Sequence, residues 1–284
     1  MTEFSIRPRR SMIFAPGDKP RMFSRALDMG ADMVCIDLED AVAPDDKDAA
    51  RDGTVGVFRQ FQPGTKIPET LVRINSLHSL EGLKDVTALL DLPNPPDGFM
   101  LAKVKSHGEI VMMDDLLVEA GANSVLHVMI ETNDALEHAF QIAMASQRVQ
   151  SLVFGAIDMA ADLRTTPDWE NLLFARSRVV HAAAGAGVDL IDVPWLDLEN
   201  MDGLKDEAQR SARLGFSGKA AIHPKQIPIL NDIFSPSVEE VDRARQIIAA
   251  FEAGDGGLVV YDGKLIEKPV LRSMQRIVAI ASTR

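Results

Sequence analysis

The sequence has little cysteine and no excess of positive charge. Its 284 residues include one cysteine, Cys35, inside an apolar run, which excludes a disulfide framework and a thiolate metal site. Forty-two acidic residues outnumber 30 basic ones, giving a formal net charge of −12. This balance disfavours nucleic acid as a partner, because phosphates are neutralised by basic groups. An anionic ligand would need a local basic pocket.

Long hydrophobic runs and a signal peptide are also lacking. The apolar stretches are interrupted well short of the ~20 residues that a membrane helix needs. The opening MTEFSIRPRRSMIF carries charges but no apolar signal core. We therefore expect a cytoplasmic protein. A composition of 46% hydrophobic and 25% charged residues is typical of a globular chain with a large core.

Short apolar runs rich in aliphatic residues recur along the chain. They begin at Ser11, Met33, Thr70, Gly98, Ser124, Ser151, Val188 and Gly218. Segments with helical periodicity, such as SHGEIVMMDDLLVEAG, separate them and end near a glycine. Eight such units predict a (β/α)8 TIM barrel over residues 1–235. A doubly wound open sheet is the alternative, although no glycine-rich dinucleotide fingerprint follows an early strand.

The pattern changes after the eighth run, over residues 236–284. We expect a helix capped by Ser237 and ended by Gly254, then a short hairpin within DGGLVVYDGKLIEKP, then a last helix from Pro269. This extension exceeds what a barrel needs. It is predicted to be a lid, or an arm that reaches a neighbouring subunit.

Polar residues follow the apolar runs at the positions where the strands should end. They are Asp37, Glu39, Arg73, Asn75, Lys103, Glu131, Asp158, Asp192 and His223. The carboxyl ends of all strands meet at one mouth of a parallel barrel, where such enzymes keep their chemistry. The sequence therefore predicts a site there.

Glu131 and Asp158 end consecutive strands, whose axes should lie about 5 Å apart. Their carboxylates can then converge on one cation. Two carboxylates without a nearby histidine or cysteine suit Mg2+ better than Zn2+. The alternative for Glu131 is a carboxylate that favours a helix start. Either Asp158 or Asp162, one helical turn later, could instead be a cap.

Three other residues have open alternatives. Arg73 lies in an otherwise apolar strand, TLVRIN, and should face carboxylates or an anionic ligand; an ion pair with Glu39 or Asp37 would also satisfy it. Lys103 could form a Schiff base, as in one class of barrel aldolases, or bind an anion, or be structural. His223 more readily orients a loop than titrates.

Several stretches closely resemble the citrate lyase β-subunit-like family of CoA-ester lyases, the HpcH/HpaI aldolase/citrate lyase family. They are RRSMIFAPGDKPRMFSRALDMGADMVCIDLEDAVAPDDKDAAR, LVRIN, MIET, FGAIDMAADL and LGFSGKAAIHPKQI. The similarity runs from about residue 9 to residue 280. The combination of DLEDAV with the later GK and IHP motifs is specific to this family, which includes citryl-CoA, citramalyl-CoA and malyl-CoA lyases.

The resemblance implies a Mg2+-dependent carbon–carbon lyase that cleaves or forms malyl-CoA or citramalyl-CoA. The products would be acetyl-CoA or propionyl-CoA and glyoxylate or pyruvate. It also implies a homotrimer or homohexamer, with Mg2+ on Glu131 and Asp158 and with Arg73 on the acyl oxygens. Lys19 and Arg25 become candidates for the CoA phosphates.

The remaining predicted site residues are expected to bind the substrate or to orient other groups. Lys103, Asp192 and His223 are expected to contact the substrate or CoA. Glu39 and Asp40 are expected to orient metal-bound water and Arg73 as part of the catalytic group.

At Glu267 the chain departs from the pattern of the family it resembles. Many lyases of that family have an aspartate in this segment, which reaches the site of a neighbouring subunit and acts there as the acid or base. The added methylene shifts the carboxyl by about 1.5 Å, enough to change its alignment for proton transfer. The alternative role for Glu267 is a charge that favours the start of the following helix.

Three rival functions remain. The first is a malyl-CoA thioesterase, in which Glu267 or Asp40 directs water. The second is a CoA-ester-binding citrate lyase β-like subunit, and the third is a Schiff-base aldolase.

Overall fold

The structure is a computed structural model that describes residues 7–61, 68–253 and 259–282. It divides into two compact units. The larger spans Arg9–Asn231, and the smaller is built mainly from Asp232–Arg284; the sequence placed the division at residues 235 and 236. All the strands predicted for the barrel lie in the larger unit.

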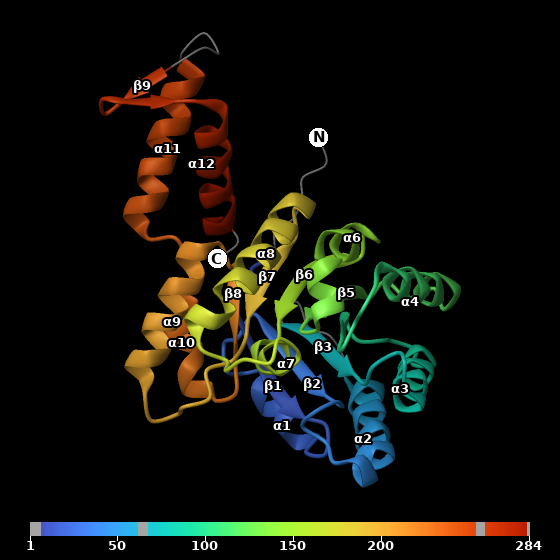
Figure 1. Ribbon diagram of the computed structural model, residues 1–284. Helices are drawn as coiled ribbons and strands as arrows, with labels where there is room; N and C mark the ends of the chain where they lie inside the picture. The colour runs from blue at the N-terminus through green and yellow to red at the C-terminus, as the bar shows by residue number, and fades with distance from the viewer. Residues whose placement is uncertain (1–6, 62–67, 254–258, 283–284) are drawn as a thin grey trace. The chain divides into compact units, whose positions relative to one another are not determined.

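Eight parallel strands close into a barrel in the larger unit (Figure 1). Each strand pairs with its neighbours in the chain, and β8 pairs with β1. The strands are β1 (Ser11–Pro16), β2 (Met33–Asp37), β3 (Glu69–Ile74), β4 (Gly98–Leu101), β5 (Val125–Ile130), β6 (Val149–Phe154), β7 (Asp189–Asp192) and β8 (Gly218–Ala221). The predicted (β/α)8 barrel is confirmed, and the open doubly wound sheet is excluded.

Helices connect the strands on the outside of the barrel. They are α1 (Arg21–Ala26), α2 (Lys47–Gln60), α3 (Leu80–Leu90), α4 (His107–Glu119), α5 (Asn133–Glu137), α6 (Ala139–Met144), α7 (Ala156–Asp162), α8 (Trp169–Ala186), α9 (Met201–Leu214) and α10 (Ile227–Ile233), with 3-10 turns η1 (Pro44–Asp46) and η2 (Pro224–Gln226). None of the helices within the described ranges is both long and apolar enough to cross a membrane.

Side chains from all eight strands fill the barrel interior. The buried cluster comprises Met12, Met33, Cys35, Leu71, Met100, Ala102, Met129, Val153, Ile191 and Ala220. Helices cover the outer face of the sheet, so both faces of each strand are buried. This explains why the strands are continuous apolar runs instead of alternating ones. Cys35 is a small core residue here and is fully buried.

Local caps determine where the helices begin and end. The side chain of Ser79 accepts a hydrogen bond from the Gly82 N–H at the start of α3, and that of Thr132 does the same at the start of α5. Helix α8 ends at Gly187, whose φ of 73° lies in the left-handed region that favours glycine. These caps satisfy backbone groups that would otherwise lack partners at the helix ends.

The smaller unit contains two helices and a hairpin: α11 (Val238–Ala253), α12 (Lys268–Ala281), β9 (Val259–Tyr261) and β10 (Lys264–Ile266). Ser237 and Glu240 form reciprocal side chain to backbone hydrogen bonds at the start of α11, a capping box. The two strands pair antiparallel, so the predicted hairpin is confirmed. The predicted helix end at Gly254 lies outside the described residues. Ile247 and Phe251 of α11 pack with Ile266 to form the core of this unit.

Candidate active site

The carboxyl ends of the barrel strands enclose a cavity of about 450 Å³. Five of the residues that line it are ionisable: Asp37, Asp40, Arg73, Glu131 and Asp158. All five were singled out from the sequence. They come from β2, β3, β5 and the start of α7 or from the loops that follow these strands. The barrel therefore brings the predicted acidic and basic residues to one mouth.

Arg73 is held by carboxylates on almost every side. Its Nε and Nη2 donate to the two oxygens of Asp37 at 2.8 and 2.5 Å, and its Nη1 lies 3.2 Å from Glu39 Oε2. The guanidinium also lies 5.2 Å from the centre of the Phe14 ring. The bidentate pair with Asp37 fixes the plane of the guanidinium. Only the Nη1 edge, which also lies 3.6 Å from Asp40, has long contacts that a ligand oxygen could replace.

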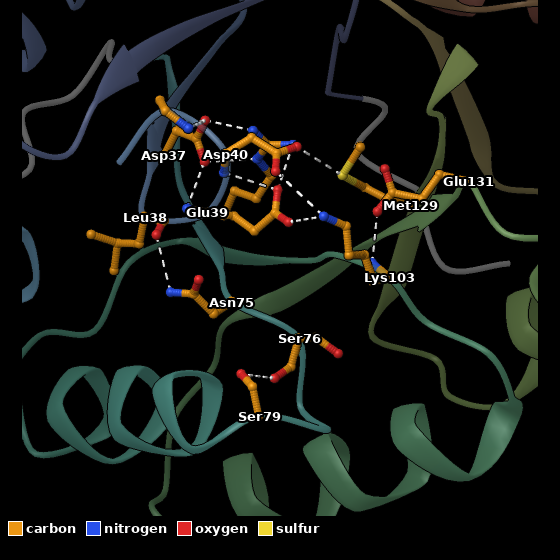
Figure 2. Close-up of polar contacts among 12 residues, drawn as sticks. Asp37, Leu38, Glu39, Asp40, Asn75, Ser76, Ser79, Lys103, Met129 and Glu131 are labelled. Carbon is orange, nitrogen blue, oxygen red and sulfur yellow. Dashed lines mark hydrogen bonds and ion pairs between the residues drawn. The ribbon is translucent and has the colours of Figure 1, made fainter. Parts of the chain in front are cut away.

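Glu39, Asp40 and Lys103 form a second charged group (Figure 2). Glu39 and Asp40 of this group also contact Arg73. Lys103 Nζ lies 2.6 Å from Glu39 Oε1 and 3.3 Å from Asp40 Oδ1. Burial raises the pKa of Glu39, although Arg73 and Lys103 oppose that shift. Burial tends to lower the pKa of Lys103, but its bond and charge interaction with Glu39 outweigh burial and raise it. An ammonium held in its charged form is poorly suited to imine formation, which argues against the Schiff-base alternative.

Glu131 follows β5 and is 1% exposed. Its Oε1 accepts a 2.7 Å hydrogen bond from the backbone N–H of Lys103. Burial raises the pKa of Glu131 to about 7, and the negative charges of Asp158 and Glu39 add to the rise. A cation at this carboxylate would favour its ionised form and offset the cost of its burial. The alternative role as a helix-start carboxylate has less support, because the cap of α5 is Thr132.

Glu131 and Asp158 fit a hard divalent cation. Asp158 is half-buried in the first turn of α7 and lines the same cavity. A side-chain carbon at Gly155 would lie 2.6 Å from Glu131 Oε2, so the glycine keeps that oxygen clear of a neighbouring side chain. Among the described residues, no group of three or more Asp, Glu, His or Cys side chains is arranged for a metal. An ion here would take most of its ligands from water or substrate, as Mg2+ commonly does.

Lys47 and Asp85 support the acidic loop and were missed in the sequence. Lys47 Nζ donates to the backbone carbonyls of Leu38 and Glu39 at 2.8 and 2.6 Å. Asp85 accepts from the side chain of Asn75. The same amide donates to the Leu38 carbonyl (Figure 2). The spacing of Lys47 in DLEDAVAPDDKDAAR was the available signal, because a lysine in the first turn of α2 can reach back to the loop.

Asp192 does not line the cavity described here and is fully buried. Its Oδ2 accepts from Lys219 Nζ at 2.9 Å and from Ser211 Oγ at 2.6 Å, and Arg176 Nη2 lies 3.5 Å from its Oδ1. Ser211 and Arg176 belong to α9 and α8, so the carboxylate faces the helices and not the mouth. This position does not support the predicted substrate contact. It indicates a structural ion pair between strands and helices.

His223, Lys19, Arg25 and Glu267 also lie outside the lining of this cavity within the described chain. The Nδ1 of His223 accepts from the Lys225 N–H at the start of η2, as expected for a loop-orienting residue. Lys19 and Arg25 are exposed on the connection after β1 and on α1. Glu267 is the exposed residue that precedes α12 in the smaller unit.

Comparisons with known proteins show the family to which the chain is similar. The model of the family described as HpcH/HpaI aldolase/citrate lyase matches residues 10–224. The citrate lyase subunit beta of Escherichia coli strain K12 is 35% identical over 279 residues, which are 93% of this chain and 90% of that protein. The L-malyl-CoA/beta-methylmalyl-CoA lyase of Rhodobacter capsulatus is 34% identical over 301 residues, covering 96% and 94%.

A solved structure of similar fold is the protein CitE from Mycobacterium tuberculosis in complex with magnesium, acetoacetate and coenzyme A. It is 28% identical and superposes with a TM-score of 0.78 over 96% of this chain and 97% of that one. These matches confirm the resemblance seen in the motifs. The chain belongs to the HpcH/HpaI aldolase/citrate lyase family and is an enzyme of the lyase type.

Proposed function

We propose that the protein is a Mg2+-dependent CoA-ester lyase that cleaves, or forms, a 3-hydroxyacyl-CoA such as malyl-CoA or citramalyl-CoA. The observation that carries this proposal is the arrangement of Arg73 and the carboxylates Glu131 and Asp158 around one cavity. The malyl-CoA lyase relative and the magnesium and coenzyme A complex of a structural neighbour support the same chemistry.

The reaction breaks the bond between the α and β carbons of the acyl chain. A base takes the proton of the β-hydroxyl, the carbinol carbon becomes the carbonyl of glyoxylate or pyruvate, and the electron pair of the broken bond enters a thioester enolate. That enolate then takes a proton on carbon to give acetyl-CoA or propionyl-CoA. No oxidant or second substrate is required, and condensation is the same sequence in reverse.

The residues of this chain would divide the work. Arg73, held in plane by Asp37, would donate its Nη1 edge to the enolate oxygen, where negative charge develops. Glu131 and Asp158 would hold Mg2+, which supplies a Lewis acid for the carboxylate and oxygen of the acid half. Glu39 and Asp40 would orient Arg73, and Glu39, whose pKa burial raises, suits proton transfer.

Five further residues have proposed roles: Lys19, Arg25, Lys103, Glu267 and His223. The exposed Lys19 and Arg25 would contact CoA phosphates. Lys103, half-buried beside Glu39 and Asp40, would contact the substrate or CoA. Glu267 would act as acid or base in a neighbouring subunit of a homotrimer or homohexamer, and His223 would orient the loop after β8. The buried single cysteine agrees with a cytoplasmic location.

The decisive assay incubates the protein and Mg2+ with malyl-CoA, citramalyl-CoA and citryl-CoA, and measures 2-oxo acid and free thiol separately. A lyase releases 2-oxo acid without thiol. Thiol without 2-oxo acid would contradict the lyase and indicate a thioesterase. CoA-ester binding without either product would indicate a binding subunit.

Two substitutions test the proposed metal ligands directly. Glu131→Ala and Asp158→Ala should each abolish Mg2+-dependent turnover and Mg2+ binding measured by calorimetry. Asp162→Asn is the matched control, because Asp162 lies one turn after Asp158 on the exposed side of α7 and retains an oxygen for the Asn133 N–H. Activity retained in either alanine variant would overturn the metal assignment.

A further inference from the structure

A second cavity of about 200 Å³ adjoins the candidate active site. Its lining residues come from α7, α8, α9 and the connections that precede α8 and follow β7. Four of them, Ala156, Ile157, Val193 and Pro194, also line the active-site cavity, so the two cavities share a wall. The carboxylates proposed to hold Mg2+ are not among the described residues that line this second cavity.

Arg176 of α8 is the charged residue at the floor of this cavity. It lines the cavity and is 1% exposed. The carbon of its guanidinium lies 4.9 Å from the centre of the Phe154 ring and 4.6 Å from the centre of a Trp169 ring. Aromatic faces attract a cation without accepting its N–H groups in conventional hydrogen bonds. The two rings therefore hold the guanidinium in place and leave its donors for other partners.

Two of the three nitrogens of this guanidinium lack an acceptor. Within the ranges that the structure describes, neither Nε nor Nη1 of Arg176 has a hydrogen-bond partner, although both atoms are buried. Nη2 lies 3.5 Å from Asp192 Oδ1, which is an ion-pair contact. A buried donor without an acceptor costs about 1–3 kcal/mol, and more when the group is charged. An acceptor brought into the cavity by a ligand would remove this cost.

The acidic residues that line the cavity have other partners. Glu207 accepts a 2.7 Å hydrogen bond from Lys219 Nζ. Asp197 is exposed, and its side chain accepts from the Glu199 N–H at 3.0 Å. The guanidinium of Arg176 is thus the charge that is least compensated at this site. An ionised acceptor bonds more strongly to a guanidinium than a neutral acceptor does, which favours an anionic ligand.

The remaining lining suits a short aliphatic chain. Ile157, Val193, Pro194 and Leu196 contribute apolar side chains. The volume is below the range of about 300–1,000 Å³ that is usual for sites of drug-sized ligands. We propose that this cavity binds a small aliphatic monocarboxylate, with its carboxylate on the free nitrogens of Arg176 and its chain against the apolar side chains. Neither the metal nor the reacting groups of the proposed lyase take part in this binding.

The tryptophans of the chain provide a local readout. The sequence has two, Trp169 beside Arg176 and Trp195 in the lining of the second cavity. Neither is among the described residues that line the active-site cavity. Butyrate, titrated in the presence of EDTA to remove Mg2+, should change the tryptophan fluorescence in a saturable way. Butyramide has the same shape without the charge and should bind about tenfold or more weakly. No saturable change with butyrate, or equal binding of butyramide, would overturn the proposal.

Opposite charges at Leu196 test the position of the carboxylate. Leu196 is 58% exposed, so its substitution should leave the fold intact. Leu196→Lys should tighten butyrate binding and Leu196→Asp should weaken it, each by about threefold or more, because the added charge lies near the ligand. Leu80→Lys and Leu80→Asp, at an exposed leucine of α3, are the matched controls and should leave the affinity unchanged. The same effect from both charges at Leu196 would contradict an anion in this cavity.

Arg176→Met removes the proposed partner of the carboxylate. Butyrate binding should be lost in this variant, and circular dichroism checks that the protein is folded, because Arg176 is buried beside Asp192. Binding retained in the folded variant would overturn the proposal. If the variant does not fold, the opposite shifts expected at Leu196 decide it.

Discussion

The backbone N–H of Lys103 donates a 2.7 Å hydrogen bond to Glu131 Oε1 from a residue whose φ is 54°. A lysine rarely adopts this left-handed conformation, which costs about 1–2 kcal/mol. The same residue places its ammonium 2.6 Å from Glu39. Lys103 thereby connects the carboxylate proposed as a metal ligand to the acidic loop after β2, through its backbone on one side and its side chain on the other.

Lys103→Met should separate these two contributions. The variant keeps the backbone N–H to Glu131 but leaves Glu39 and Asp40 with one cation fewer. We expect kcat/KM to fall by about 10- to 100-fold, as for loss of one electrostatic contact in a site. Mg2+ affinity, measured by calorimetry, should change by less than about threefold because the donor to Glu131 remains. Loss of Mg2+ binding would mean that the ammonium, and not the backbone, positions Glu131.

Borohydride supplies the control for the chemical role of Lys103. Trapping in the presence of pyruvate should leave the wild-type protein active and Lys103 unlabelled in peptide mass analysis. Labelling of Lys103 would show that its amine forms an imine. This would contradict the expectation that Glu39 keeps the amine in its charged form.

Gly155→Ala should displace Glu131. The added carbon would lie 2.5 Å from Glu131 Cβ and 2.6 Å from its Oε2, so something must shift. We expect Mg2+ affinity to fall by about tenfold or more, with a loss of about 1–3 kcal/mol in the free energy of unfolding from overpacking. Calorimetry and urea denaturation measure the two effects.

Gly56→Ala is the matched control for that substitution. Gly56 lies within α2, and a carbon added there meets no atom within 4 Å. Alanine in a helix interior should stabilise the protein by about 0.5–1 kcal/mol and leave Mg2+ binding unchanged. Loss of Mg2+ binding in both variants would show that the effect at Gly155 is not local.

The sequence predicted the strands well because each is a continuous apolar run with a helical segment on either side. It also identified which strand ends carry charge, since charges interrupt those runs. Side-chain direction was harder, because neighbouring strand residues point to opposite faces. Asp192 faces α8 and α9, whereas Val193, the next residue, lines the cavity. The partners of Asp192, including Lys219, lie up to 27 residues away, so no local pattern showed the ion pair.

Asp192→Asn should lower stability much more than it lowers activity. The substitution removes the carboxylate that pairs with the guanidinium of Arg176, and it leaves the buried Lys219 with Glu207 as its remaining carboxylate partner. Breaking a buried ion pair typically costs about 3–5 kcal/mol, which urea denaturation would register. The kcat/KM of the remaining folded protein, assayed below its unfolding temperature, should stay within about threefold of the wild type if Asp192 only supports the sheet. A variant that is as stable as the wild type but has greatly reduced activity would support the substrate contact that the sequence predicts for Asp192.

Glu267→Asp should raise lyase activity if Glu267 acts as acid or base in a neighbouring subunit. The shorter side chain would restore the aspartate that the resemblance to the family implies for this position. A misplacement of about 1 Å can cost about 100-fold in rate. Glu252→Asp, an exposed residue near the end of α11, is the control. A change in α12 stability without a change in kcat would identify Glu267 as a helix-start charge.

The contacts of Glu69, at the amino end of β3, predict that the free energy of unfolding falls at acid pH. Its carboxylate is 2% exposed and accepts from Arg9 Nε at 2.7 Å and from Arg9 Nη2 at 3.0 Å, and His127 Nε2 lies 3.7 Å away. Burial alone would raise the pKa of Glu69. The interactions with His127 and Arg9 outweigh burial and hold the pKa well below its usual value.

A depressed folded-state pKa gives the direction of the pH effect. The stabilisation by ionised Glu69 is fully present above the unfolded pKa of about 4.3 and is lost as pH falls toward the lower folded pKa. Glu69→Gln should therefore reduce the free energy of unfolding by about 3–5 kcal/mol at neutral pH. The difference from the wild type should narrow as pH falls below about 4, where the unfolded carboxyl takes up its proton. Urea denaturation between pH 7 and pH 3.5 measures this, with the exposed Glu119→Gln as control. A difference that stays constant over that range would show that the ionised carboxylate does not stabilise the barrel.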